Sequence, residues 1–501
     1  MSTNDTPRTS YVLGAREERV FVGLGAVEVV ALCAFLALSL AVLMSQKSAV
    51  GGGAALVIAG VGVAAAWLPI AGRSGVQWLL IGVRWAAVRT GGVQRWSRRP
   101  ETFLRKGRLS QLVDLPGELG RLELWEAHDR RGTPVGVIRD RKANTYVATL
   151  LVRGTTNWTL EGEDEQARIV ADYGSMLARL ARDRAATSRV AWVERTLPEA
   201  PDALVRDLYE HRAADVSFDD ARTRSYLELL EGAGRQADHH ELLVTVLVRG
   251  AAARRQAKRR KWSNRDAPHL VLMEELALVA SQLELAHMEV RAALSPSAYL
   301  AALRTGLDPW GRLAFEQSFQ ADESVDESQI APTAREEHWN RVIVDGSQHA
   351  TLWVEAWPGM RVGPGFLDPL LVDSDGAVRT AAVVMELRGP RTGARKAEHD
   401  VTEAEAAEAT RRSIGKRTSS RVRKRDQSRY DHEDELADGH ADVRFVGYII
   451  VSAPGSDPSV LETEVDRVSM QASGCNLRIE RLYGAQASAL TFGLPLARGL
   501  R

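Results

Sequence analysis

The chain has 501 residues and a formal net charge of zero, because 65 lysines and arginines balance 65 aspartates and glutamates. A dedicated nucleic-acid-binding protein normally has a strong excess of basic residues, so this balance argues against that class of protein. The two cysteines, Cys33 and Cys475, are too few for a disulfide framework and lack the spacing of a zinc site. The length predicts roughly two to four domains.

Two apolar stretches stand near the N-terminus, Val20–Met44 and Ala49–Ile70. Each is long enough for a helix of about 20 residues, which is what the hydrocarbon core of a membrane requires. We therefore expect a cytoplasmic tail over 1–19 and a transmembrane hairpin over 20–70. A second span directly after the first disfavours a signal peptide. Arginines on both sides of the hairpin predict an inner-membrane protein with both termini in the cytoplasm. Glu28 is expected at the headgroup boundary, and the alternative is a proton or ion path.

The segment 71–100 has the pattern of a cationic amphipathic helix. Apolar residues between Val76 and Ala87 recur on one helical face, while arginines and tryptophans flank it. We expect this helix to lie in the inner membrane interface, and the alternative is a helix packed on the following domain. The predicted membrane-interface residues are Trp78, Arg84, Trp85, Arg89 and Trp96.

Beyond residue 101, strand-like and helix-like apolar patterns alternate. The expected strands cover residues 134–140, 145–154, 189–196, 241–248, 349–358, 378–389, 441–454 and 476–484. The expected helices cover residues 163–183, 201–213, 269–291, 294–309 and 458–473. Helices interspersed with hairpins predict an α+β fold, with two mixed α/β layered modules behind the transmembrane hairpin. The expected modules are 101–316 and 339–501, joined by a polar linker over 317–338, and the second carries a charged helical arm over 402–440.

The charged arm contains a basic block over 411–429 followed by an acidic run over 430–442. A basic block of this kind is a candidate contact for nucleic acid or anionic lipid. The candidate polyanion contacts are Arg421, Arg423, Lys424 and Arg425. The acidic run neutralises much of the field of the basic block, so we favour pairing between the two blocks or a solvated arm.

Catalytic signatures are missing from the sequence. The nearest approach to a phosphate-binding P-loop is Gly415–Lys416, but Thr410 and Arg417 occupy positions that need glycine and a hydroxyl residue. His432 and Glu433 begin a zinc-protease motif, but Leu436 takes the place of the second ligand. We therefore expect no catalytic residues, no cofactor and no metal, and a protein that is not an enzyme.

Several passages together resemble a family of actinobacterial membrane proteins encoded among conjugation and type IV secretion components. These passages are "GVIRDRKANTYVA", "ERTLP", "SYLELLEGAG", "HHELLVTVLV" and "LSPSAYLAALRTGLDP". The N-terminal hairpin with "GVQWLLIGVRW" is similar to the PrgI family, the small two-span inner-membrane subunit of those systems.

The C-terminal part, "DGHADVRFVGYIIVSAP" through "LRIERLYGAQASALTFGLPLARGL", resembles the N-terminal, non-ATPase region of the TraC/CagE/TrbE conjugation ATPases. In those ATPases a comparable stretch precedes the nucleotide-binding domain, and this sequence stops where that domain would begin. The resemblance implies an inner-membrane scaffold or adaptor that anchors a separate ATPase. The implied partners are a P-loop secretion ATPase encoded nearby, other inner-membrane channel subunits and the lipid bilayer, in an oligomeric assembly. The candidate partner-docking residues are Leu482, Tyr483, Phe492, Leu494 and Leu496.

Three alternatives stay open at this point. The stretch 353–371 is compatible with an EccE-like membrane component of a type VII secretion system. A DNA-contacting channel subunit would use the basic block over 411–429. A membrane-bound enzyme without a recognisable motif is the third alternative.

Overall fold

The structure is a computed structural model. It describes residues 26–45, 48–67, 69–70, 73–90, 94–97, 119–120, 122–155, 161–183, 185–198, 220–234, 238–262, 267–312, 332–358, 362–363, 365–371, 378–389 and 442–500, with a few isolated positions between 391 and 405.

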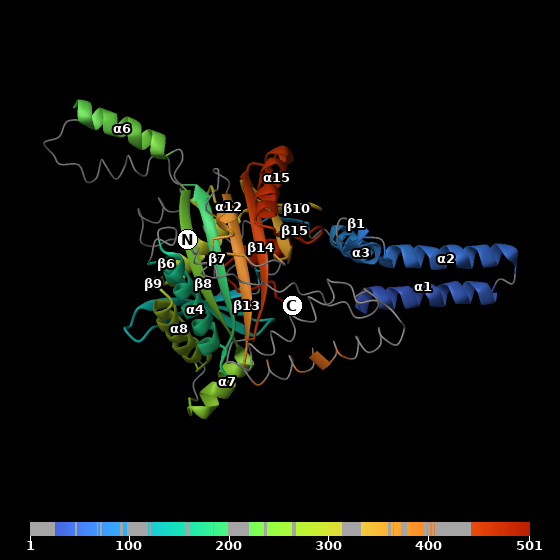
Figure 1. The fold of residues 1–501 in the computed structure, drawn as a ribbon, viewed down its shortest axis with the longest axis horizontal. Helices are drawn as coiled ribbons and strands as arrows, with labels where there is room; N and C mark the ends of the chain where they lie inside the picture. Colours follow the sequence, from blue (N-terminus) through green and yellow to red (C-terminus); the bar gives the residue numbers. More distant parts are fainter. Residues whose placement is uncertain are drawn as a thin grey trace, which may run out of the picture.

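The first half of the body is a four-stranded antiparallel unit with helices in its two crossovers. Its elements are β6 (Thr145–Gly154), α4 (Glu163–Leu180), β7 (Thr187–Pro198), β8 (Asp238–Arg249), α7 (Gly250–Arg259), α8 (Ala267–Leu285) and β9 (Met288–Ala293). In space the strands lie in the order β9-β6-β8-β7. This order of strands and helices is the split β-α-β, or ferredoxin-like, arrangement. Helix α6 (Ala221–Gly234) lies in the connection between β7 and β8 and projects from the body (Figure 1).

The second half repeats the same architecture. Its elements are β12 (Ser347–Ala356), α12 (Asp368–Leu371), β13 (Val378–Arg388), β14 (Asp442–Pro454), α15 (Pro458–Gly474) and β15 (Arg478–Arg481). The strands lie in the order β15-β12-β14-β13, again antiparallel. Two halves with the same order of elements and the same strand order constitute an internal repeat of the fold.

A β-hairpin precedes each unit and extends its sheet. These hairpins are β4 (Leu122–His128) with β5 (Pro134–Asp140), and β10 (Ala334–Glu337) with β11 (Val342–Val344). In the first unit β5 pairs with the beginning of β6, and β9 pairs with the end of β6 on the same edge. In the second unit β11 and β15 pair in the same way with the beginning and the end of β12. The correspondence between the halves therefore extends to their edges.

The two units join through antiparallel pairing of β7 with β13, which runs from Arg189 opposite Glu386 to Thr196 opposite Arg379. The result is one sheet of 13 strands, visible at the centre of Figure 1. The body is thus α+β on a single large antiparallel sheet. The first repeat lies within the expected module 101–316 and the second within 339–501, and the two repeats share one sheet.

Most expected elements differ from the structure by a few residues at their ends, and two differ by more. The helix predicted over 269–291 ends at Leu285, because His287 adopts a left-handed backbone with φ of 61° and the chain continues as β9. Strand β10 lies inside the predicted linker 317–338. The predicted helix 201–213 and most of the arm 402–440 lie outside the described residues.

The apolar residues of the central strands are buried on both faces, because helices or chain segments cover both. On β8, Leu243 and Leu247 belong to the cluster on one face, while Val244, Val246 and Val248 belong to the other. On the face of the sheet that carries Val244, helices α4 and α8 cover the first repeat, and α12 and α15 cover the second. The opposite face, which carries Leu243, is covered by helix α9 (Pro296–Leu307) and by the C-terminal segment, residues 486–500.

The C-terminal segment contains α16 (Gln486–Leu490) and the 3-10 turn η4 (Thr491–Gly493), and it packs across both repeats. Its apolar side chains Leu490, Leu494, Leu496 and Leu500 are buried in the same cluster as strand residues of both halves. The guanidinium of Arg195, on β7, is fully buried beneath this segment. It donates hydrogen bonds to the carbonyl of Gly493 in the segment at 3.4 Å and to the carbonyl of Ala302 in α9 at 2.7 Å. The hydroxyl of Tyr299 donates to the carbonyl of Pro495.

The N-terminal helices form a hairpin of α1 (Ala26–Ser45) and α2 (Ala49–Trp67), which lie side by side away from the sheet (Figure 1). A short ribbon of β1 (Pro69–Ile70) and β2 (Arg73–Ser74) leads into α3 (Gly75–Thr90), and β3 (Arg95–Ser97) pairs with β10 at the sheet edge.

The transmembrane hairpin predicted over 20–70 is corrected by this part of the structure. Helix α1 (Ala26–Ser45) contains Glu28, and 12 of the 19 residues of α2 are the small residues Gly and Ala. Among the residues that the structure describes, no helix has the length and apolar character needed to cross a membrane. The predicted two-span fold and the inner-membrane location with cytoplasmic termini are therefore not upheld.

We expect Leu494→Ala to lower the free energy of unfolding by about 2–4 kcal/mol, because it leaves a cavity in the cluster that both repeats share. Urea unfolding measures this change. Met470→Ala on the exposed side of α15 is the control and should change stability by less than about 0.5 kcal/mol. Equal effects of the two substitutions would show that the C-terminal segment does not complete the core.

Candidate functional site

An aromatic cluster joins α3 to the second repeat. The ring centroid of Trp339 lies 6.2 Å from that of Trp78, 5.7 Å from that of Trp85 and 6.0 Å from that of Tyr483. Gly484 has a positive φ of 69°, and a Cβ there would meet Trp339 and Ile81 at 2.9 Å. The cluster therefore needs glycine at this turn.

The structure places the five predicted membrane-interface residues on two elements. Trp78 and Trp85 point into the aromatic cluster and contact the body, which is the packed-helix alternative. Arg84 and Arg89 are exposed on α3, and Trp96 belongs to strand β3, where it pairs with Arg335 of β10. The amphipathic pattern thus reflects packing on the body for two of its tryptophans.

The hairpin α1–α2 has a large apolar surface. The two helices contact each other through small residues: the Cβ position of Gly62 meets Phe35, and Ser39 donates to the carbonyl of Ala55 at 2.7 Å. The larger side chains face outward, with Leu56 and Val50 more than three-quarters exposed. The other large exposed apolar residues of the hairpin are Val30, Leu36, Leu38, Leu40, Leu43, Met44, Val57, Val61 and Val63.

The five predicted docking residues lie mostly in contact with the chain's own core. Leu494 and Leu496 are buried, and Leu482 and Phe492 are partly buried against the same cluster. Tyr483 belongs to the aromatic cluster. The two buried leucines offer no free surface in this structure. The candidate polyanion residues Arg421, Arg423, Lys424 and Arg425 lie outside the described residues.

A serine and a histidine meet in the second repeat, but their burial makes the pair structural. His349 is fully buried, and its Nδ1 lies 2.8 Å from the hydroxyl of Ser452. Its Nε2 lies 2.9 Å from the carbonyl oxygen of Leu307, so Nε2 carries the proton and donates it. Burial lowers the pKa of His349 to about 4, which keeps the imidazole neutral. With Ser452 buried as well, a substrate has no access to the hydroxyl.

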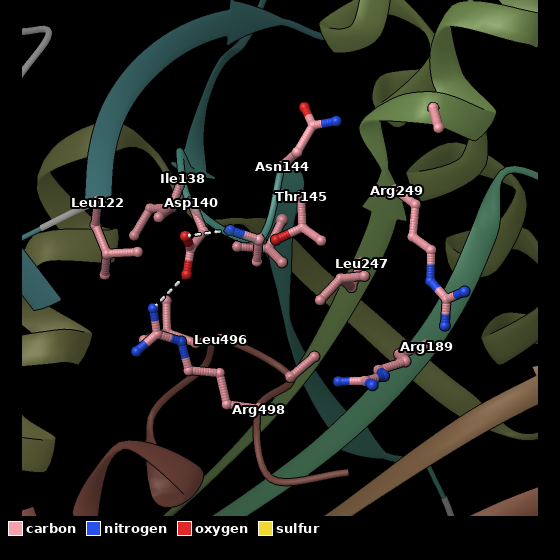
Figure 2. A pocket seen from close by; sticks show the side chains of 14 residues that line it. Leu122, Ile138, Asp140, Asn144, Thr145, Arg189, Leu247, Arg249, Leu496 and Arg498 are labelled. Carbon is pink, nitrogen blue, oxygen red and sulfur yellow. Dashed lines mark hydrogen bonds and ion pairs between the residues drawn. The ribbon is translucent and has the colours of Figure 1, made fainter. Parts of the chain in front are cut away.

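A cavity of about 390 Å³ lies between the sheet of the first repeat, the start of α7 and the C-terminal segment. Figure 2 shows the residues that line it. Its apolar wall consists of Leu122, Ile138, Val147, Leu247 and Leu496. Its polar side chains are Asp140, Asn144, Thr145, Arg189, Arg249 and Arg498.

The three arginines of this cavity have different partners. Arg498 donates to a carboxylate oxygen of Asp140 at 2.6 Å, and Arg249 donates to Glu386 at 2.8 Å. Arg189 donates from Nη2 to the neutral carbonyl of Leu500 at 2.8 Å, and its Nε is buried without a hydrogen-bond partner. Burial and the neighbouring charges of Arg249 and Arg444 lower the pKa of Arg189, while Glu386 opposes them. The cavity is therefore positive and suited to an anion.

Sequence reasoning did not find this cavity. Its charged residues come from four stretches of chain that the fold brings together, and each is an ordinary arginine or aspartate by itself. The one local signal is the turn around Lys142–Asn144, where Asp140 accepts hydrogen bonds from the backbone nitrogens of Lys142 and Ala143, both at 2.9 Å. That turn was expected from the sequence, but nothing local to it indicates a binding site.

No protein-family model matches the chain, and no curated protein matches it. The resemblance to conjugation and secretion proteins therefore stays a hypothesis. Within the described part of the chain, no group of three or more His, Cys, Asp or Glu side chains is arranged to hold a metal ion.

We expect the stability of the protein to fall in acid partly through His349. Its folded pKa of about 4 lies below the ordinary value of 6.5, so the unfolded chain takes up the proton first as the pH falls. The stability that His349 contributes is present above pH 6.5 and is lost as the pH falls below it. Between pH 7 and pH 4.5 the free energy of unfolding should fall by about 2 kcal/mol for this reason. His349→Gln should reduce the difference between urea unfolding free energies at the two pH values by this amount. The exposed His128→Gln should leave it unchanged, and the same pH dependence in all three proteins would contradict the assignment.

We expect Trp339→Ala to loosen α3 from the body, since its two aromatic contacts with α3, to Trp78 and Trp85, are lost and each contributes about 0.5–1.5 kcal/mol beyond area burial. Hydrogen exchange of amides in α3 should become at least about tenfold faster, a change of 1.4 kcal/mol, while exchange in β8 stays the same. Trp262→Ala, which removes a ring that lies under Arg260, is the matched control. Unchanged exchange in α3 of Trp339→Ala would show that the helix is held by other contacts.

Proposed function

We propose that the protein is a non-enzymatic scaffold subunit of a type IV secretion or conjugative transfer apparatus. In this role it joins a separate P-loop ATPase to other subunits of the machine. The observation that carries the proposal is the exposed apolar surface of the hairpin α1–α2, beside a body whose own apolar clusters are packed inward. Exposed apolar surface of this extent is typical of an interaction site.

The construction of the hairpin supports contact with partner helices. Small residues, such as Gly62 and Ala55, occupy the contact between the two helices. The larger side chains are thereby left on the outer faces, where the exposed Leu56, Val57 and Val61 lie on two successive turns of α2. Burying one such side chain contributes roughly 1.5–3 kcal/mol, so a few of them suffice for a stable contact.

The aromatic cluster supports an adaptor role, because it connects the hairpin to the body by packed side chains. Trp78 and Trp85 of α3 pack on Trp339, and β3 then pairs with β10 at the edge of the sheet. The hairpin is thus connected to the second repeat by side-chain packing and by backbone pairing. This second repeat contains the region whose sequence resembles the non-ATPase part of conjugation ATPases, which supports the ATPase as the partner of the body.

Co-purification tests the proposal. The tagged full chain is expressed together with the P-loop ATPase and the channel subunits encoded beside it, and each is quantified in the eluate. The double variant Leu56→Ser with Val61→Ser should reduce recovery of the channel subunits more than about tenfold and leave recovery of the ATPase unchanged.

The control is Leu229→Ser with Met470→Ser, which alters exposed apolar residues of α6 and α15 outside the hairpin. This control should retain every partner. If the unaltered chain recovers neither the ATPase nor the channel subunits, the scaffold role is excluded. If the hairpin variant and the control behave alike, the hairpin is not the contact surface.

A further inference from the structure

The cavity beside the C-terminal segment has the composition of a binding site for a small charged molecule. Its volume of about 390 Å³ falls in the ordinary range for ligand pockets, which combine a mostly apolar wall with a few polar groups. The three arginines and one aspartate that line it, together with Glu386 that pairs with Arg249, leave a formal charge of +1. This inference is independent of the scaffold role.

Arg189 is the residue that points most directly to an anionic ligand. It lies on β7, and its guanidinium faces the cavity on the same side as that of Arg249 (Figure 2). Its Nε is buried without a partner, and its Nη2 donates to an uncharged carbonyl. A half-buried guanidinium with a free N–H and another cation beside it is stabilised by an anion that accepts from both.

The start of helix α7 adds to this preference. Arg249 is the N-cap residue of α7 and makes no side-chain cap, while Ala251 in the first turn lines the cavity. The backbone N–H of Gly250 is bound to the carbonyl of Asn144 at 2.8 Å, which fixes the helix start against the turn of β5 and β6. The partial positive charge of a helix N-terminus favours a phosphate next to it.

We propose that this cavity binds a small organic phosphate. The phosphate group accepts hydrogen bonds from Arg189 and Arg249 at the start of α7. The organic part lies on the apolar wall formed by Leu122, Val147 and Leu496. A phosphate monoester has three terminal oxygens for the two guanidinium groups, whereas a carboxylate has two. Because Leu496 and Arg498 belong to the C-terminal segment, the bound molecule also holds that segment on the sheet.

Isothermal titration calorimetry on the full chain, with four matched probes, tests the proposal. Phenyl phosphate has both the dianion and the apolar body, benzoate has a monoanion on the same body, phenol has the body alone, and inorganic phosphate has the dianion alone. Phenyl phosphate should bind saturably and at least about tenfold more tightly than each of the other three. Adenosine monophosphate tests whether the apolar wall accepts a nucleotide base.

Variants locate the binding. Arg189→Gln and Arg249→Gln should each weaken phenyl phosphate binding at least about tenfold, and Arg249 is exposed enough for the variant to fold without it. Arg291→Gln on β9 is the control, because Arg291 is an arginine of similar exposure that does not line the cavity. No saturable binding of any probe, phenol binding as tight as phenyl phosphate, or equal binding by Arg249→Gln and the unaltered chain would overturn the proposal.

Discussion

The pairing of β7 with β13 is the contact on which the remaining architecture depends. Each strand is the outermost strand of its own four-stranded unit, and an unpaired outer strand exposes a row of backbone donors and acceptors. By pairing with each other along residues 189–196 and 379–386, the two strands satisfy these groups and turn two units into one sheet. The shared face that results is wide enough for a single apolar cluster to include residues from both repeats.

That shared face explains the position of Arg195. Its fully buried guanidinium lies on β7 at the junction and reaches α9 from the first repeat and the C-terminal segment from the second. Burial lowers the pKa of Arg195, and Glu241 at 3.4 Å opposes this shift by stabilising the charged form. A buried cation is costly when its partners are removed, so the hydrogen bonds from its two Nη atoms constrain which backbone carbonyls lie above it. The residue therefore specifies the position of both covering elements.

The sequence predicted local elements well and long-range relations poorly. The hairpin strands Pro134–Asp140 and Thr145–Gly154 match their expected bounds, because their alternation and the turn between them are local signals. The junction of β7 with β13 joins segments about 190 positions apart, and the sequence of neither strand indicates which strand it pairs with. The apolar stretches at the N-terminus were interpreted as membrane spans because periodicity and length alone cannot tell which apolar surface a helix contacts. The charged residues of the cavity come from four distant stretches, and no local pattern in any of them indicates a binding site.

The C-terminal segment has a consequence for how the chain folds. Arg498 pairs with Asp140 across 358 positions, Arg189 contacts Leu500 across 311, and Tyr299 contacts Pro495 across 196. Contacts at such separations require long loops to close before any stabilisation is gained. The strand hairpins can form early from neighbouring residues, but the face that unites the two repeats stays open until the segment from 486 onward has been synthesised and has docked. Folding of the body is therefore slow in its last step, and the exposed apolar face before that step is where aggregation competes with completion.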